Sequence, residues 1–313
     1  MQQILPGNTN KIHIFHSFKI EQRRALYSFI EKQESAHTKK HYCRDLVQFC
    51  QHYRIDDFSI VTREHVANYR SHLKDQYATA SVARKVTTLR SFFNWLEEVE
   101  VLNHNPAKLI KAPKQDNQEG KTAELSDQEV RRLLAMPNRN KLLEFRDFVM
   151  MELLFYTGLR SSEIRFLRKS DLSQEKRVYV LKVLGKGNRY RRIPIKDFIF
   201  NDLQDYLAVA TTNTDPDDYL FTPSRNNRTK ELNGPLTDTA LRCLIRKYAR
   251  LAGIEDQVCA HTARVTACGH AIEHGATEDE IMNLMGWRSP EMPRRYNRRK
   301  NQIRNSAAHR INY

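Results

Sequence analysis

The sequence predicts a mainly α-helical protein with one small β-sheet, divided into two domains. A length of 313 residues suggests two domains, and hydrophobic residues at 40% are enough to form a core in each. Apolar side chains recur at helical spacing through most of the chain. Residues 177–195 differ, because β-branched runs flank a Gly-Lys-Gly-Asn turn there. That pattern is typical of a β-hairpin.

The charge balance favours a polyanionic partner. Lys and Arg total 52 against 37 Asp and Glu, which gives a formal charge of +15. Cations that neutralise phosphates release condensed counterions, which favours binding, so we expect nucleic acid as the partner. A solubilising surface charge and an anionic membrane surface are the alternatives. The five cysteines are odd in number and form no CxxC pair. With no secretory pattern or membrane span expected, the interpretation is a soluble cytoplasmic protein without a structural metal.

Three apolar stripes predict a compact helical domain over residues 18–110. They begin at Tyr42, Val66 and Val82, and Thr62 is placed to cap the second helix. Basic side chains fall largely outside the stripes, so they are expected to form either a DNA-facing surface or a merely solvated one. These residues are Lys39, Lys40, Arg44, Arg84, Lys85 and Arg90.

A polar segment from Asn103 to Thr122 contains turn residues and predicts a linker, assigned to residues 111–124. The second domain is expected over residues 125–300. Ser126 and Glu129 can form a capping box there, with Leu125 stapled onto Val130. Further helices are expected at 148–155, 237–251, 265–273 and 278–285. An arm at residues 1–17 and a tail at residues 301–313, which can dock on a second subunit, complete the division.

Four segments of the second domain are suited to one phosphate site. Arg160 follows a helix that Gly158 ends, and an acid stands three residues later at Glu163. Lys186 is expected on the hairpin turn. His261 and Arg264 share one side of a helix start, because they are three residues apart. The fourth segment, Gly286-Trp287-Arg288-Ser289-Pro290, precedes Tyr296.

Together, TGLRSSE, LGKGNRYRRIPI, HTAR and MGW, with a tyrosine nine positions after the tryptophan, resemble the tyrosine recombinase (phage integrase) family. The run from Ser81 to Pro113 is similar to the family's helical core-binding, SAM-like domain. The resemblance thus covers residues 20–300. HTARV and Trp287 look like the Cre-type branch, and the whole pattern also resembles the Xer-type branch.

The resemblance implies a helical core-binding domain joined to a mixed α/β catalytic domain. It implies that Arg160 and Arg264 bind the scissile phosphate and that Glu163 orients Arg160. Further implied roles are protonation of the leaving 5′ oxygen by Lys186, proton transfer by His261, hydrogen bonding by Trp287 and attack by Tyr296. No metal or cofactor is implied. DNA contacts are also expected from Arg189, Arg191, Arg288, Arg294, Arg295 and Arg298.

Two positions depart from the family's usual pattern. Most relatives have His where this chain has Trp287, and an indole cannot transfer protons at neutral pH. Many have a second basic residue or His where this chain has Val265. Both departures shift acid–base work onto Lys186 and His261.

The resemblance implies a site-specific recombinase that binds inverted repeats in double-stranded DNA. It would assemble as a homotetramer and exchange strands through a Holliday junction, with no membrane involved. A relaxing enzyme of type IB topoisomerase character and a catalytically silent DNA-binding accessory protein remain as alternatives. Exchange between two sites distinguishes the first, and a covalent DNA adduct excludes the last.

Overall fold

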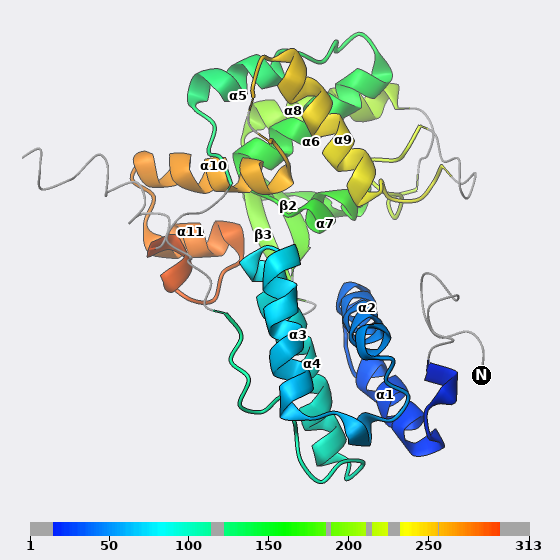
Figure 1. Cartoon of the computed structure of the whole chain (residues 1–313). Helices are drawn as coiled ribbons and strands as arrows, with labels where there is room; N and C mark the ends of the chain where they lie inside the picture. Colours follow the sequence, from blue (N-terminus) through cyan, green and yellow to red (C-terminus); the bar gives the residue numbers. More distant parts are fainter. Residues whose placement is uncertain are drawn as a thin grey trace, which may run out of the picture. The chain divides into compact units, whose positions relative to one another are not determined.

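The chain forms two compact units, residues 1–117 and 118–313 (Figure 1). The computed structural model describes residues 15–113, 122–185, 189–210, 215–224, 232–255 and 257–294. Lys186, Arg295, Tyr296 and Arg298 therefore lie outside the described residues, as do the tail at 301–313 and most of the expected arm at 1–17.

The first unit is a helical bundle with one core. Its helices are α1 (Ile20–Glu31), α2 (Ala36–Tyr53), α3 (Arg63–Gln76) and α4 (Thr79–Glu98). The three predicted stripes correspond to α2, α3 and α4, and the Thr62 side chain caps α3 as expected. Helix α1 was not predicted. Its buried stripe is short, and no side-chain cap marks its start.

The core of the first unit begins before the predicted start of the helical domain and includes part of the polar segment that follows α4. Phe15 is fully buried and packs against Phe18, with tilted rings whose centroids are 5.6 Å apart. At the other end, Ala107 and Ile110 are buried in the same core, although they lie in the polar segment that begins at Asn103. Apolar side chains at both ends thus anchor the segments that flank the bundle.

Lys85 is a correction to the predicted basic surface. Its side chain is 4% exposed, and its ammonium pairs with the buried carboxylate of Asp45 on α2 at 3.3 Å. Arg84 contacts the same carboxylate, and Thr88 donates to it. A buried charge must be paired, so Lys85 neutralises Asp45 between α2 and α4 and does not face solvent.

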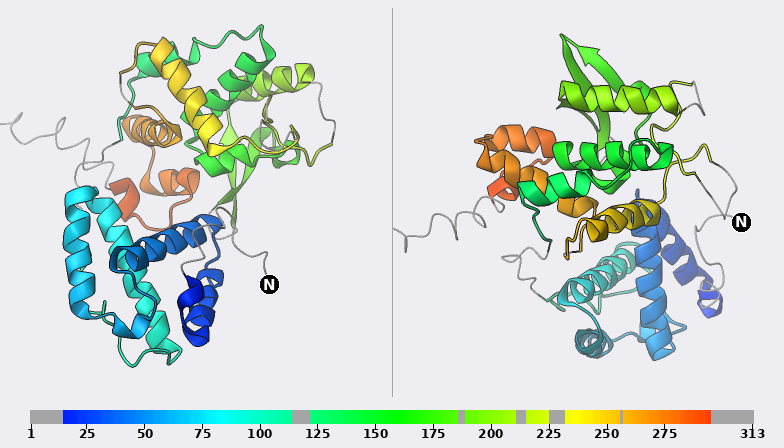
Figure 2. Two further views of the ribbon diagram at one scale, coloured as in Figure 1. Left: turned by 45° about the vertical axis from the view of Figure 1, so that its right-hand side comes forward. Right: turned by 90° about the horizontal axis from the view of Figure 1, so that it is seen from above.

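The second unit surrounds the buried helix α6 (Leu142–Thr157). Buried residues occupy nearly all of its circumference, and it packs against both α8 (Asp197–Val209) and α10 (Ala260–Glu273) (Figures 1 and 2). The remaining helices are α5 (Asp127–Leu134), α7 (Ser161–Arg165), α9 (Asp238–Leu251) and α11 (Glu278–Met285). Ser126 and Glu129 form the predicted capping box at the start of α5.

The sheet has three antiparallel strands in the order β1-β2-β3. The predicted hairpin is confirmed as β2 (Val178–Gly185) and β3 (Arg189–Ile195), with Val183 opposite Arg191. Strand β1 (Leu172–Glu175) was not predicted. Its residues are mostly exposed, so no alternation of apolar and polar side chains marks it.

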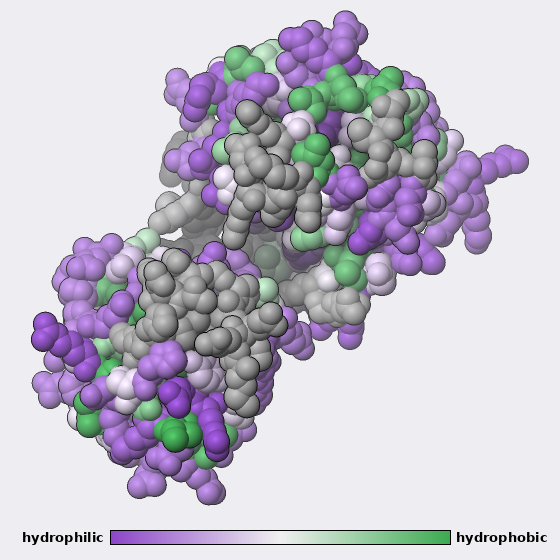
Figure 3. Space-filling model, turned by 90° about the vertical axis from the view of Figure 1, so that its right-hand side faces the viewer, coloured by the Kyte–Doolittle hydropathy of each residue, from purple (hydrophilic) through white to green (hydrophobic). Residues whose placement is uncertain are grey.

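Hydrophilic side chains predominate on the face drawn in Figure 3, where apolar ones gather in small groups. Within the described residues, no helix is both long and apolar enough to cross a bilayer.

Candidate active site

Arg160 lies at the junction between α6 and α7, directly after the turn that ends α6. Gly158 makes that turn at φ +63°, a left-handed conformation that side chains rarely adopt. A Cβ built on Gly158 would lie 2.7 Å from the terminal methyl carbon of Met285, so a side chain there would also displace the end of Met285. The start of α7 is thereby held against the end of α11.

Glu163 fixes Arg160 as the sequence predicted. One carboxylate oxygen accepts from the Arg160 guanidinium at 2.7 Å, and the other accepts from the Arg160 backbone N–H at 2.8 Å. The Glu163 side chain is 2% exposed, whereas that of Arg160 is 33% exposed. The guanidinium is therefore held from the protein side while part of it remains open to a ligand.

Arg191, which the sequence analysis assigned to DNA contacts, binds other parts of the protein. Its two terminal nitrogens donate to the two Glu163 carboxylate oxygens, each at a distance of 2.8 Å. Its Nε donates to the Leu284 carbonyl at 3.1 Å. Its side chain is 13% exposed. Arg191 thus joins β3 to α7 and to the end of α11.

Glu163 stays ionised throughout the physiological range. Burial by itself raises the pKa of its carboxyl, but the hydrogen bonds from Arg191 and from Arg160 outweigh burial and hold the pKa at about 2. A permanent negative charge therefore lies between two guanidinium groups.

Arg264 is buried on α10, where its guanidinium binds two helix ends. It donates to the Gly158 carbonyl at 2.7 Å and to the Met285 carbonyl. The Trp287 ring lies 5.3 Å from the guanidinium carbon. Arg264 and Trp287 are thereby placed beside the turn that carries Arg160.

His261 lies in the first turn of α10, one turn before Arg264. The residue is exposed, yet partial desolvation of the ring, followed by the Arg264 charge, lowers the pKa of His261 below its ordinary value of 6.5. The imidazole is therefore neutral at pH 7 and able to accept a proton. Arg160, Glu163, His261, Arg264 and Trp287, five of the seven residues predicted as catalytic, thus belong to one local arrangement.

Lys186 and Tyr296 lie outside the described residues, but their neighbours in the sequence are described. A Cβ built on Gly185 would be 3.3 Å from a guanidinium nitrogen of Arg191 and 3.9 Å from a Glu163 carboxylate oxygen. The residue that precedes Lys186 is thus next to the arginine cluster. Arg294, two residues before Tyr296, pairs with Glu278 at 3.1 Å.

The other basic residues predicted to bind DNA fall into two groups. Lys39 pairs with Glu31 at 2.6 Å, and Arg44 contacts His41 at 2.9 Å. The exposed residues that have no acidic partner among the described residues are Lys40, Arg90, Arg189 and Arg288. Exposed cations are thus available on both units.

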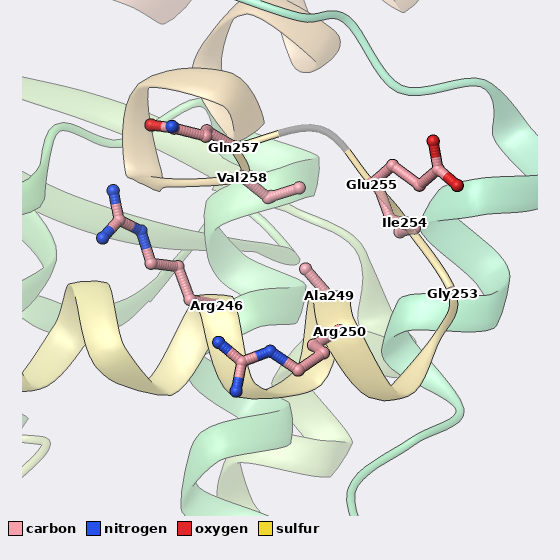
Figure 4. A pocket seen from close by; sticks show the side chains of 8 residues that line it. All are labelled: Arg246, Ala249, Arg250, Gly253, Ile254, Glu255, Gln257 and Val258. Atoms are coloured by element: carbon pink, nitrogen blue, oxygen red, sulfur yellow. The ribbon is translucent and has the colours of Figure 1, made fainter.

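Sequence analysis missed an arginine stripe on α9. Arg242, Arg246 and Arg250 recur every fourth residue and are exposed. The last two line a pocket of about 510 Å³ together with Gln257 and Val258, which come just before α10 (Figure 4). The four-residue spacing in the sequence was a signal that could have identified this stripe.

Two histidines four residues apart on α10, His270 and His274, have structural partners. His270 lies 3.2 Å from both the Leu125 carbonyl and an Asp127 carboxylate oxygen. The His274 ring contacts the His270 carbonyl at 2.7 Å. The contacts of His270 join the end of α10 to the start of α5.

Comparisons with known proteins cover both units. A model of the phage integrase family matches residues 123–302, and a model of the phage integrase N-terminal SAM-like domain matches residues 26–99. Tyrosine recombinase XerD of Proteus mirabilis is 31% identical over 82% of this chain and 81% of its own length. Tyrosine recombinase XerC of Myxococcus xanthus is 30% identical over 85% of this chain and 88% of its own length.

Solved structures share the fold. XerH recombinase bound to palindromic difH substrate, in a post-cleavage complex, superimposes with a TM-score of 0.73 at 17% identity. That match covers 94% of this chain and 90% of the XerH chain. A lambda integrase dimer bound to a COC′ core site superimposes with a TM-score of 0.68 at 16% identity, over 90% of this chain and 77% of the integrase chain.

Proposed function

Because the chain belongs to the phage integrase family of tyrosine recombinases, we propose that it recombines DNA through a 3′-phosphotyrosyl bond to Tyr296. The observation that carries the proposal is the fixation of two arginines around one turn. Arg264 binds the Gly158 carbonyl, and Glu163 holds Arg160 two residues further on.

Two fixed guanidinium groups suit the charge that the reaction develops. A phosphodiester is already negative and gains charge on its non-bridging oxygens as a nucleophile approaches. Preorganised donors in a site that excludes water stabilise that charge without reorganising during the reaction. We assign Arg160 and Arg264 to these oxygens, and Trp287 to a further hydrogen bond from its indole N–H.

The proposed step is a transesterification, which exchanges one phosphate ester bond for another. The Tyr296 oxygen forms a bond to phosphorus, its proton passes to neutral His261, and the bond to the 5′ oxygen breaks. Lys186 protonates that leaving oxygen. Attack by a 5′ hydroxyl on the phosphotyrosine reverses each of these transfers, so religation needs no external energy source.

The proposed assembly is a homotetramer in the cytoplasm, acting on inverted repeats through a Holliday junction. The XerH structure, with its palindromic difH substrate, supports a symmetric site. The lambda integrase dimer on its core site supports binding by paired protomers. The tail at residues 301–313, proposed to dock in trans, would couple this assembly to Tyr296.

The α9 stripe extends the proposed DNA-binding surface. Neither Arg246 nor Arg250 has an ion pair within the part of the chain that the structure describes, and both line the pocket beside the start of α10. Cations on this face can neutralise DNA phosphates close to His261. We add both residues to Lys40, Arg90, Arg189 and Arg288.

An exchange assay tests the proposal against its alternatives. Duplexes that bind the protein are selected from a random-sequence library and inserted as two sites in one plasmid. A recombinase exchanges flanking DNA between the sites, whereas a relaxing enzyme changes only the linking number. A silent accessory protein binds the duplex but forms no covalent adduct on a nicked version of it. Adducts without exchange, at any site spacing or orientation, would contradict recombination.

A further inference from the structure

Arg191 lies between the two parts of the site that must be held together. Through Glu163 it is connected to Arg160, and through the Leu284 carbonyl it is connected to the segment that leads to Trp287. Arg264 binds the next carbonyl along, that of Met285. Two neighbouring carbonyls at the end of α11 thus accept hydrogen bonds from two different arginines.

Two glycines leave room for the Arg191 side chain. A Cβ built on Gly286 would lie 3.2 Å from both Cδ and Nη1 of Arg191, and one on Gly185 would lie 3.3 Å from Nη1. Gly286 also adopts φ +62° where α11 ends. The guanidinium is therefore enclosed by the residue before Lys186 and the residue before Trp287.

We propose that Arg191 is a positioning residue for strand cleavage: its guanidinium holds the Glu163–Arg160 pair in register with the Trp287 segment. The inference rests on the proposed function, because it concerns the same site. Arg191 acts through Glu163 and the Leu284 carbonyl, since both Glu163 oxygens and that carbonyl accept from it. A shift of about 1 Å at such a site can cost about 10²-fold in rate.

Variants of two adjacent arginines provide a matched pair. Arg191→Met removes the three donated hydrogen bonds. Arg192→Met removes the same charge from the next position, where the side chain is 72% exposed and pairs with exposed Glu175. Successive residues of β3 face opposite sides of the sheet. Arg191→Lys keeps the charge but cannot reach Glu163 and Leu284 together, which provides a second variant if Arg191→Met unfolds.

Cleavage is measured in single turnover on a nicked duplex selected by binding. We expect a loss of about 10²-fold for Arg191→Met, about tenfold for Arg191→Lys and no loss for Arg192→Met, measured well below the melting temperature of each variant and with similar DNA affinities. An Arg191→Met rate equal to that of Arg192→Met would overturn the proposal.

The pH profile separates positioning from a general structural effect. Arg160 and Arg191 are the charged groups that face Glu163 within the described residues; Arg165 and Asp238 lie together between α7 and α9, 4.0 Å apart. Without Arg191, Arg160 is left to oppose the effect of burial, so the pKa of Glu163 should rise. The ratio of Arg191→Met to wild-type rate should therefore fall as pH decreases. Adding Glu163→Gln to both proteins should make the ratio independent of pH, and a ratio that never depends on pH counts against the proposal.

Trp287 provides a measurement that needs no catalysis. The chain has two tryptophans, so Trp95→Phe leaves Trp287 as the only one. In that background, Arg191→Met should shift Trp287 emission and increase its quenching by acrylamide, while Arg192→Met should change neither. Unchanged emission and quenching in Arg191→Met would refute the link to Trp287. A wild-type protein that fails to cleave DNA contradicts the proposed function, yet the fluorescence comparison still decides the role of Arg191.

Discussion

Arg264 donates a hydrogen bond of 2.7 Å to the carbonyl oxygen of Gly158, two residues before Arg160. This contact joins α10 to the turn at the end of α6. Because Arg264 also binds the Met285 carbonyl, one buried side chain fixes the ends of two helices beside Trp287. Its geometry, as well as its charge, is therefore part of the site.

Arg264→Lys should abolish most strand cleavage while DNA binding persists. A lysine ammonium is a point charge and cannot contact two carbonyls and a phosphate in one plane. Loss of preorganised charge stabilisation should reduce the single-turnover rate by about 10²–10³-fold. Binding of a selected duplex, measured in parallel, controls for folding. A lysine variant that cleaves at the wild-type rate would show that the planar guanidinium is not needed.

Cleavage should depend on pH through His261. Its pKa is lowered by desolvation and by Arg264, so the neutral, proton-accepting form persists below pH 6.5. The rate should therefore stay constant as pH falls past 6.5 and decline only at lower pH. His261→Gln should lower the rate by about 10²–10⁴-fold and remove this decline. A midpoint above 6.5, or an unchanged decline in the variant, would exclude His261 as the base.

Cleavage should survive an excess of EDTA, because Arg160 and Arg264 supply the positive field in the proposed mechanism. DNA affinity should instead fall steeply with salt, by roughly 10³-fold between 50 and 200 mM if six or more phosphates are neutralised. Nicked-duplex cleavage with and without EDTA, and filter binding across salt concentrations, measure the two effects. Restoration of lost cleavage by added Mg²⁺ would contradict the mechanism.

Lys85 and Arg90 should differ in what their loss affects. Lys85→Ala leaves Asp45 with fewer partners in a buried site, at a cost of about 1–3 kcal/mol in the free energy of unfolding. Arg90 is exposed, so Arg90→Ala should leave stability unchanged and weaken DNA binding slightly. Urea denaturation and salt-dependent binding distinguish them. The opposite pattern would restore Lys85 to the DNA-facing surface.

Helical spacing in the sequence could have predicted that Lys85 is buried. Lys85 follows Val82 by three residues and precedes Leu89 by four, so it belongs to the buried stripe of α4. The acidic partner, Asp45, lies 40 residues earlier in the sequence. Spacing could have placed Lys85 inside the bundle, but only the packing of α2 on α4 reveals how its charge is neutralised.

In the candidate site, too, local contacts could be predicted from the sequence and long-range contacts could not. Local motifs predicted Arg160 with Glu163 and His261 with Arg264, because each pair lies three residues apart. Arg191 was assigned to DNA because its partner is 28 residues away. Contacts across the fold, such as that of Arg191 with Leu284, depend on tertiary packing that spacing does not encode. Strand β1 was not predicted because its residues are mostly exposed and show no alternation of apolar and polar side chains.

The central claim is that Tyr296 becomes covalently bonded to DNA. Tyr296→Phe removes one oxygen and leaves shape and charge almost unchanged, so binding of a selected duplex should persist. On a nicked duplex, wild-type protein should form a complex that survives denaturation, and digestion followed by mass spectrometry should locate the phosphate on Tyr296. The variant should form none. A denaturation-resistant complex from Tyr296→Phe, or phosphate on another of the 13 tyrosines, would contradict the claim.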